Sequence, residues 1–269
     1  MVSAIISLGL SGLVIGILLA YAAHKFKVET DPRVAEIISV LPGANCGGCG
    51  FPGCAALAQA IAEGKAATNA CVVGGSKVAE MIAKIMGVES EAAEPVVAVV
   101  YCQGNCDNAV ISAEYEGLED CHALHALGGT KKCSYSCVGL GSCVKACVFD
   151  AIHMGEDGIP VVDREKCTGC GACAKACPRG IIEMVPASKK VHILCRSYDK
   201  GPVTRKNCKV GCIACQACVR ACPQKTIFMD RGTLAKIDYK GCDNCGICVT
   251  KCPVKTIKSY EEKAEAAAS

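Results

Sequence analysis

Aromatic side chains are scarce in this sequence of 269 residues, which has no tryptophan and only four phenylalanines. A chain with so few large apolar rings builds a thin core, and bound metal centres can then supply much of the folding energy. The scarcity also argues against nucleic-acid binding, because the basic residues lack aromatic partners that would stack on bases. The length is enough for two or three small domains.

No basic residue precedes the uncharged apolar stretch at residues 4–23, whose sequence is AIISLGLSGLVIGILLAYAA. Twenty apolar residues are about the length that spans a bilayer. The missing basic N-terminal region argues against a cleaved signal peptide. Because His24, Lys25 and Lys27 follow the stretch directly, the positive-inside rule predicts a single-pass anchor in the cell membrane with the bulk of the chain in the cytoplasm. A reducing cytosol also suits a chain rich in thiols.

Cysteine, by contrast, is abundant, with 25 residues that gather in tight runs. Near neighbours in sequence rarely form useful disulfides, but they wrap well around a metal centre. Three runs fit the pattern C-x2-C-x2-C-x3-C-P of bacterial ferredoxins: Cys167/Cys170/Cys173/Cys177, Cys212/Cys215/Cys218/Cys222 and Cys242/Cys245/Cys248/Cys252. A zinc site needs only two cysteine pairs and explains neither the third cysteine nor the Cys-Pro step. The runs therefore predict [4Fe–4S] clusters.

The cysteines also reveal an internal repeat. Eight of them, beginning with Cys133, Cys137, Cys143 and Cys147, recur further along the chain at one constant offset. An offset shared by so many residues indicates a duplicated module. In such modules the fourth cysteine of a run ligates the other cluster of the pair. This crossing rule predicts three complete ligand sets: Cys147/Cys167/Cys170/Cys173, Cys212/Cys215/Cys218/Cys252 and Cys222/Cys242/Cys245/Cys248.

A fourth set is incomplete, because Leu140 stands where the duplicate has Cys215. Cys137, Cys143 and Cys177 supply only three thiols. Either Cys133 is the fourth ligand, or the site holds a [3Fe–4S] cluster or a cluster with an unusual ligand. Cys208 occupies the matching place in a module that needs no extra ligand, so Cys133 need not be a substitute.

Several cysteines lie outside these sets. Cys102, Cys106 and Cys121 could bind one further cluster together with Cys133, which would bring the total from about five to six. Cys121 and Cys195 precede Cys133 and Cys208 at nearly equal separations, so they could also be structural thiols of the repeat. A buried free cysteine behaves as a small apolar residue.

Another constellation is GANCGGCGFPGC, with Cys46, Cys49 and Cys54, followed by Cys71. Its glycines let a short loop fold closely around a cluster and aim N–H groups at its sulfurs. The spacing differs from that of ferredoxins and of common zinc sites. It predicts a separate [4Fe–4S] cluster.

These features predict an α+β chain with an N-terminal transmembrane helix, a small helical [4Fe–4S] domain and two ferredoxin-like modules. The expected segments are an anchor at 1–27, the helical domain at 28–88, a linker with additional cysteines at 89–130, modules at 131–186 and 187–258, and a tail at 259–269. Asp31-Pro32 marks a helix start, and the Val-rich run at 95–102 indicates a strand.

Charge is distributed unevenly along the chain. Residues 131–258 hold 22 Lys and Arg against 10 Asp and Glu, whereas the other residues hold 7 against 16. The basic excess either compensates the negative charge of cluster thiolates or forms a docking face for an acidic partner such as soluble ferredoxin.

The order of anchor, the LPGANCGGCGFPGC block at 41–54, Cys71 and ferredoxin runs resembles the B subunit of the Rnf complex, from Ile5 to about Lys258. The longer form, with YCQGNC at 101–106 and KKCSYSC at 131–137, is similar to versions from anaerobes. The resemblance implies a membrane complex that couples electron flow from reduced ferredoxin to NAD with Na⁺ or H⁺ pumping. This chain would relay electrons from soluble ferredoxin to the other Rnf subunits, and would have no complete active site of its own.

Three other functions fit parts of the pattern. A polyferredoxin arm of another membrane complex, such as a hydrogenase, shares the modules but not the 46–71 block. A corrinoid methyl carrier would need a cobalamin-binding domain, for which the chain has no room. Clusters could also serve only as folding staples. One-electron transfer requires no catalytic residue, so four histidines are predicted to be ordinary surface or packing residues: His122, His125, His153 and His192.

Overall fold

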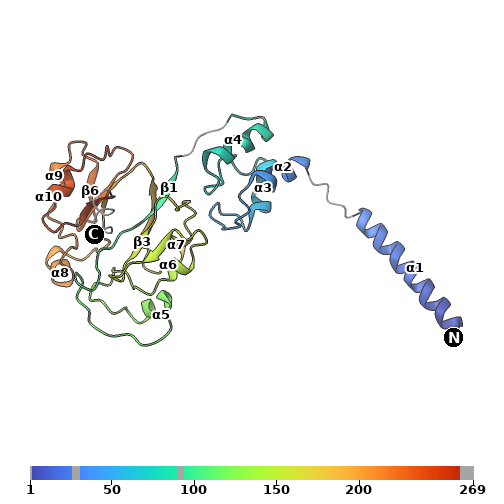
Figure 1. Ribbon diagram of the computed structural model, residues 1–269, viewed down its shortest axis with the longest axis horizontal. Coiled ribbons are helices and arrows are strands. Elements are labelled where there is room, and N and C mark those ends of the chain that lie inside the picture. The colour runs from blue at the N-terminus through green and yellow to red at the C-terminus, as the bar shows by residue number, and fades with distance from the viewer. Residues whose placement is uncertain (1, 26–30, 90–93, 261–269) are drawn as a thin grey trace.

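The computed structural model describes residues 2–25, 31–89 and 94–260 (Figure 1). Helix α1, Val2–Lys25, covers the apolar stretch. Its large apolar side chains between Leu10 and Tyr21 are exposed. In the described part of the chain, no helix has both the length and the apolarity of a membrane span. Most of the predicted tail, residues 261–269, lies outside the described residues.

Three helices form a small domain that carries the first cysteine block: α2 Pro32–Val40, α3 Cys54–Ala62 and α4 Gly75–Met86. Helix α2 begins where Asp31-Pro32 predicted, because the Asp31 carboxylate accepts the Arg33 N–H at 2.9 Å and Pro32 occupies the first turn. The helices pack around Ile37, Leu57 and other buried apolar residues.

The first ferredoxin-like module pairs its strands in two short antiparallel sheets. Strand β1, Val96–Val100, pairs with β4, Ile182–Pro186, and β2, Ile152–Met154, pairs with β3, Pro160–Val162. One-turn helices α6, Ser142–Lys145, and α7, Ala172–Lys175, follow the cysteine loops. The strand at 96–100 therefore belongs to the module, although sequence alone placed it in the linker.

The second module repeats this arrangement. Strand β5, Val191–Ile193, pairs with β8, Ile257–Ser259, and β6, Ile227–Asp230, pairs with β7, Leu234–Ile237. Helices α9, Ala217–Ala221, and α10, Ile247–Lys251, follow its cysteine loops. It also has α8, Gly201–Asn207, before the first loop.

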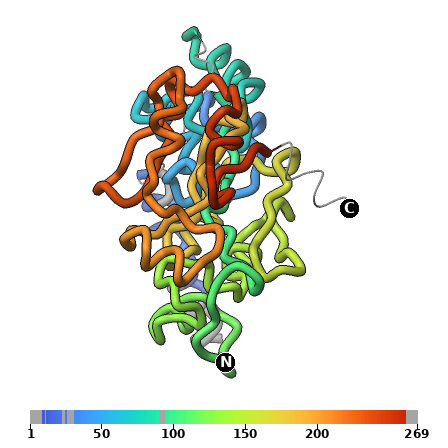
Figure 2. The backbone as a smooth tube through the Cα atoms, turned by 90° about the vertical axis from the view of Figure 1, so that its left-hand side faces the viewer, coloured from blue at the N-terminus to red at the C-terminus, as the bar shows by residue number. Residues whose placement is uncertain are grey.

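The segment at 101–130, which follows β1, contacts both modules. It runs beside the residues around α8 of the second module and includes helix α5, Cys121–Ala126 (Figures 1 and 2). The Val110 N–H donates to the Asn207 carbonyl at 2.9 Å, and the Val110 carbonyl accepts the Lys132 N–H at 2.9 Å. One residue thus bonds to both modules, so their relative placement is fixed by main-chain hydrogen bonds.

A polar network also lies between the modules. The hydroxyls of Tyr101 and Tyr239 are 2.9 Å apart, and His192 Nδ1 lies 2.7 Å from the Tyr239 hydroxyl. Arg164 lies 3.3 Å from the other ring nitrogen of His192. His192 is therefore a buried packing residue, and the other three histidines of the prediction are exposed: His122, His125 and His153.

Candidate metal centres

Five cavities are each lined by four cysteines. The five sets are Cys46/Cys49/Cys54/Cys71, Cys121/Cys137/Cys143/Cys177, Cys147/Cys167/Cys170/Cys173, Cys212/Cys215/Cys218/Cys252 and Cys222/Cys242/Cys245/Cys248. Within the described ranges, no three His, Cys, Asp or Glu side chains are arranged to hold one metal ion. Four thiols around one cavity are the donor set of a [4Fe–4S] cluster.

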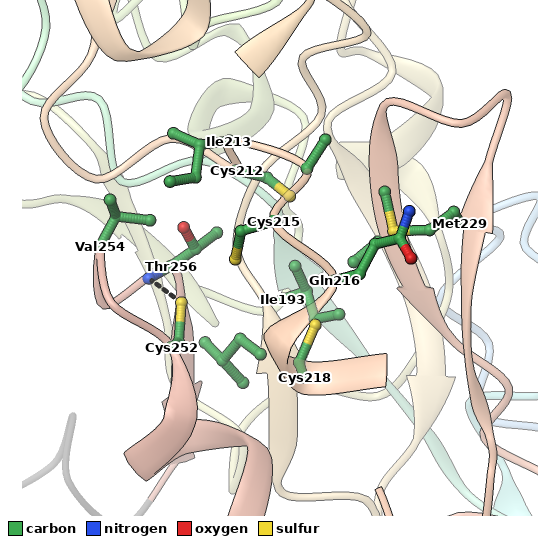
Figure 3. Close-up of a pocket in the computed structure, with 13 residues that line it drawn as sticks. Ile193, Cys212, Ile213, Cys215, Gln216, Cys218, Met229, Cys252, Val254 and Thr256 are labelled. Atoms are coloured by element: carbon green, nitrogen blue, oxygen red, sulfur yellow. Dashed lines mark hydrogen bonds between the residues drawn. The ribbon is translucent and has the colours of Figure 1, made fainter. Parts of the chain in front are cut away.

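Figure 3 shows how one such cavity is built. Cys212, Cys215 and Cys218 come from one loop, and Cys252 reaches in from the end of α10. Gln216 has a left-handed φ of 58° just before α9, so the loop turns sharply enough to aim its cysteines at one point. The Thr256 N–H donates to the Cys252 sulfur at 3.3 Å.

Three cavities contain the cysteine sets that the crossing rule predicts. In each, three cysteines of one run meet a distant fourth, which is Cys147, Cys222 or Cys252. Short antiparallel sheets and one-turn helices bring the two runs of a module together, which is why a residue distant in sequence completes each set.

Two of the ligands that the crossing rule predicts are exposed rather than enclosed. Cys215 and Cys245 line their cavities but lie at the protein surface, whereas Cys218 and Cys248 of the same loops are buried. Both exposed residues are the middle cysteines of a C-x2-C-x2-C run. The spacing alone gave no sign of this difference between ligands of one run.

The set that sequence left incomplete has a different fourth member. Cys121 lines the cavity of Cys137, Cys143 and Cys177. The Cys121 N–H donates to the Ser142 hydroxyl at 2.8 Å, and that hydroxyl lies 3.2 Å from the Asp120 carboxylate. Asp120 in turn caps α5 by accepting the His122 N–H at 2.7 Å. These hydrogen bonds fix helix α5 against α6. Cys121, the first residue of α5, thereby supplies the thiol that is missing from the loop because it has Leu140 in place of a cysteine.

The prediction from sequence considered Cys133 for this place and grouped Cys121 with Cys102 and Cys106. The structure separates these residues: Cys121 lies at the Cys137 cavity, and Cys106 is exposed. In the sequence near Cys121, the only local signal for its place is the helix-capping residue Asp120. That residue predicts where a helix begins, but not where the helix packs.

The first cysteine block lies against the first module. Its loop is closed by the Asn45 side chain, which accepts the Cys54 N–H at 2.8 Å. A Cβ at Gly48 would lie 2.7 Å from the Cys170 carbonyl oxygen, so glycine permits this close approach. The Lys175 ammonium donates to the Gly47 carbonyl at 3.3 Å. The Cys46 and Cys170 cavities are therefore held near one another.

The remaining cysteines show the repeat more fully than the sequence did. The Cys102 sulfur accepts the N–H groups of Gly104 and Cys137, both at 3.3 Å. The Cys195 sulfur accepts those of Ser197 and Cys212, at 3.5 and 3.4 Å. Cys195 is thus the counterpart of Cys102, and not of Cys121. With Cys133 and its counterpart Cys208, they form a group at the module junction, here named the junction cysteines.

Burial raises the pKa of several cavity thiols. It raises that of Cys137, Cys173 and Cys218 to about 12, and that of Cys143 and Cys248 to about 11. Without metal these thiols are protonated at neutral pH. A cluster bound as thiolates must release those protons.

Three family models match parts of the chain. A model for a putative Fe-S cluster matches residues 41–73, a 4Fe-4S binding domain matches 160–183, and a 4Fe-4S dicluster domain matches 211–256. These ranges contain none of the junction cysteines, and they contain every cavity cysteine except Cys121, Cys137, Cys143 and Cys147. The chain therefore carries multiple [4Fe–4S] clusters.

The similar proteins agree on one family. The chain is 50% identical to the B subunit of the Na(+)-translocating ferredoxin:NAD(+) oxidoreductase complex from Acetobacterium woodii, over 86% of this chain and 70% of the relative. It is 46% identical to the B subunit of the ion-translocating oxidoreductase complex from Methanosarcina acetivorans, over 75% of this chain and 76% of the relative. This chain belongs to the family of Rnf B subunits.

A third family member is the B subunit of the proton-translocating ferredoxin:NAD(+) oxidoreductase complex from Clostridium ljungdahlii, 47% identical over 75% of this chain and 72% of the relative. The resemblance inferred from sequence is confirmed. As an Rnf B subunit with several [4Fe–4S] clusters, the chain is an electron-transfer component of an oxidoreductase complex.

Proposed function

We propose that this chain is the ferredoxin-facing arm of a membrane-bound, ion-translocating ferredoxin:NAD oxidoreductase. It takes electrons from reduced soluble ferredoxin and relays them to the other Rnf subunits. The observation that carries the proposal is the series of five four-thiol cavities within one chain of this family. Bound clusters would supply one-electron transfer, and the four cysteines at each cavity would be their ligands.

The chain's own residues set the spacing and the electrostatics of the relay. Main-chain N–H groups donate to cavity sulfurs, as Ala98 does to Cys167 and Ala151 does to Cys147, both at 3.4 Å. Such hydrogen bonds favour the more negative, reduced state and so raise a reduction potential. No general acid, base or nucleophile is needed.

Electrons enter, on this proposal, at the Cys212 cavity. Cys215 is exposed there, and α8 lies against the same loop, since a Cβ at Gly201 would clash with the Ile213 carbonyl. Four exposed basic residues lie on or beside α8: Lys200, Arg205, Lys206 and Lys209. They form a positive surface beside an accessible thiol, which suits an acidic electron donor.

The other exposed ligand, Cys245, is less suited to that donor. The Asp243 carboxylate accepts the Cys245 N–H at 3.1 Å, so a negative charge lies beside this thiol. Asp243 also accepts a hydrogen bond from the Gln224 amide at 3.1 Å, which holds the carboxylate in place. An acidic donor would meet like charge at the Cys245 loop and opposite charge at α8.

Electrons leave through the Cys46 block, which contacts the Cys170 loop. Of the five cysteine sets, the set of this block comes first after α1 along the chain. We propose that α1 anchors the chain in the cell membrane in a single pass, with the modules in the cytoplasm. Exposed apolar side chains from Leu10 to Tyr21 support this, together with the basic residues that follow.

The test uses the purified complex and ferredoxin-driven NAD⁺ reduction. The double variant Arg205→Glu/Lys206→Glu should raise the KM for ferredoxin at least several-fold, while added salt should slow the wild type. Lys84→Glu, an exposed lysine of α4, is the matched control and should leave KM unchanged. Equal KM values for all three proteins would refute docking at α8.

A further inference from the structure

The four junction cysteines, Cys102, Cys133, Cys195 and Cys208, lie outside the five cavities. Cys102, Cys133 and Cys208 are buried, and Cys195 is partly buried. Each module contributes two of them, and the two pairs occupy matching places in the repeat. Buried thiols of single modules could be simple packing residues, but here the pairs of both modules meet.

Main-chain hydrogen bonds bring the two modules together at this place. Val110 bonds to Asn207 through its N–H and to Lys132 through its carbonyl. These partners immediately precede Cys208 and Cys133 in sequence. Ala109 and Cys208 form an antiparallel bridge on the same segment. The two cysteines are therefore held on either side of one extended stretch of chain.

Cys102 lies at the centre of the group. A Cβ at Gly104 would lie 3.5 Å from the Cys102 sulfur and 3.9 Å from the Cys208 sulfur, so the two sulfurs flank this glycine. Burial raises the pKa of Cys133, and the thiols of Cys102 and Cys208 raise it further, which places all three within electrostatic range of one another. The Cys102 thiol also contributes to the raised pKa of Cys195, after burial and the neighbouring Cys212.

Hydrogen-bond donors and a cation lie around the group. The Cys102 and Cys195 sulfurs each accept two main-chain N–H groups. The Lys131 ammonium donates to the Gly104 carbonyl at 2.7 Å, which places a positive charge beside the group. Backbone donors and a nearby cation stabilise thiolate sulfur, whereas a purely apolar packing site would lack them.

We propose that Cys102, Cys133, Cys195 and Cys208 bind a sixth [4Fe–4S] cluster at the junction of the two modules. Its ligand set differs from the one expected from sequence, with Cys195 and Cys208 in place of Cys106 and Cys121. The site lies between the Cys137 and Cys212 cavities, because Cys102 and Cys195 bond to the main chain of those two residues. One electron leaving either neighbouring cluster would reduce this one and then pass on, so the two modules form a single path.

The experiment begins with the intact wild-type chain, purified without oxygen. Native mass spectrometry and elemental analysis should give six clusters, about 24 iron and 24 sulfide per chain. The variants Cys102→Ser and Cys208→Ser should each contain less iron than the wild type, and the double variant, which lacks two of the four ligands, should retain about 20 of both with the five other clusters intact. Cys106→Ser is the matched control, since Cys106 is exposed, and should retain the full content of the wild type.

The wild-type measurement does not depend on whether a variant folds. About 20 iron atoms in the wild type would overturn the sixth site while leaving the proposed relay of five clusters untouched. Zinc at this place, or a wild-type mass that shows a disulfide among the four cysteines, would overturn it as well. Loss of iron in Cys106→Ser equal to that in Cys102→Ser would refute the ligand set.

Discussion

Removing the Cys121 sulfur is predicted to convert one four-iron site into a three-iron site. Cys121 lines the cavity of Cys137, Cys143 and Cys177 as its fourth thiol. In Cys121→Ala the hydrogen bond from the residue 121 N–H to Ser142 persists, because it involves only main chain on that side. Alanine also favours the helix. The change therefore removes a ligand and leaves the position of α5 unaltered.

The expected magnitude follows from the energetics of metal binding. Thiolate-rich structural metal sites bind with roughly 10–16 kcal/mol, so one ligand of four is worth about 3 kcal/mol. That is on the order of a hundredfold in affinity for the iron it holds. Loss of a small buried side chain costs only about 1–2 kcal/mol in comparison. The variant should fold, lose about one iron per chain and keep its sulfide.

Iron and sulfide analysis together with EPR of the oxidised protein measures this outcome. Cys121→Ala should show the signal of an oxidised three-iron cluster, which the wild type lacks. Adding Leu140→Cys to the variant restores the ferredoxin spacing and should abolish the signal. Full iron content and no new signal in Cys121→Ala would refute the assignment.

Three further predictions concern the same sites. The Thr226 hydroxyl lies 3.5 Å from the Cys222 sulfur, so Thr226→Val should lower the potential of that cluster by about 40 mV, the equivalent of roughly 1 kcal/mol for one electron; an unchanged midpoint in a redox titration would contradict it. Gly48→Ala should slow electron transfer from the first module to the Cys46 block, because the new Cβ would clash with the Cys170 carbonyl; rapid-freeze EPR with unaltered transfer would count against that contact. Burial raises the pKa of Cys137 and Cys218 from 9.0 to about 12. The protonated thiols therefore stabilise the folded apo chain below about pH 9, and this stability is lost as the pH rises towards about 12. Denaturant titrations of the apo chain at about pH 8 and about pH 10 should show the loss, and equal stability at both would contradict the prediction.

Local sequence spacing predicted much of the site, and long-range packing decided the rest. The three C-x2-C-x2-C-x3-C-P runs predicted three cavity sets, because the ligands of a run are fixed by one short loop. Cys121 was not predicted for the Cys137 site, since its position depends on the tertiary bond between α5 and Ser142. No spacing rule encodes that contact, nor the exposure of Cys215 and Cys245 at their loops.

The repeat was also only partly visible in the sequence. Cys195 lies shortly before Cys208, whereas a much longer stretch separates Cys102 from Cys133. The longer connection, which includes α5, conceals that Cys102 and Cys195 are equivalent. Distance in sequence also explains why the strand at 96–100 was assigned to a linker. Its partner strand, β4, comes only after both cysteine loops of the module.

Electron uptake by the intact chain tests the central claim most directly. Reduced ferredoxin would be added stepwise to the oxidised chain without oxygen, and cluster reduction would be followed by EPR and absorbance. A relay predicts reversible reduction of several clusters per chain, at rates that fall with ionic strength. Clusters that are present in full but stay oxidised in the presence of excess reduced ferredoxin would contradict it, and would indicate that they serve only to hold the fold together.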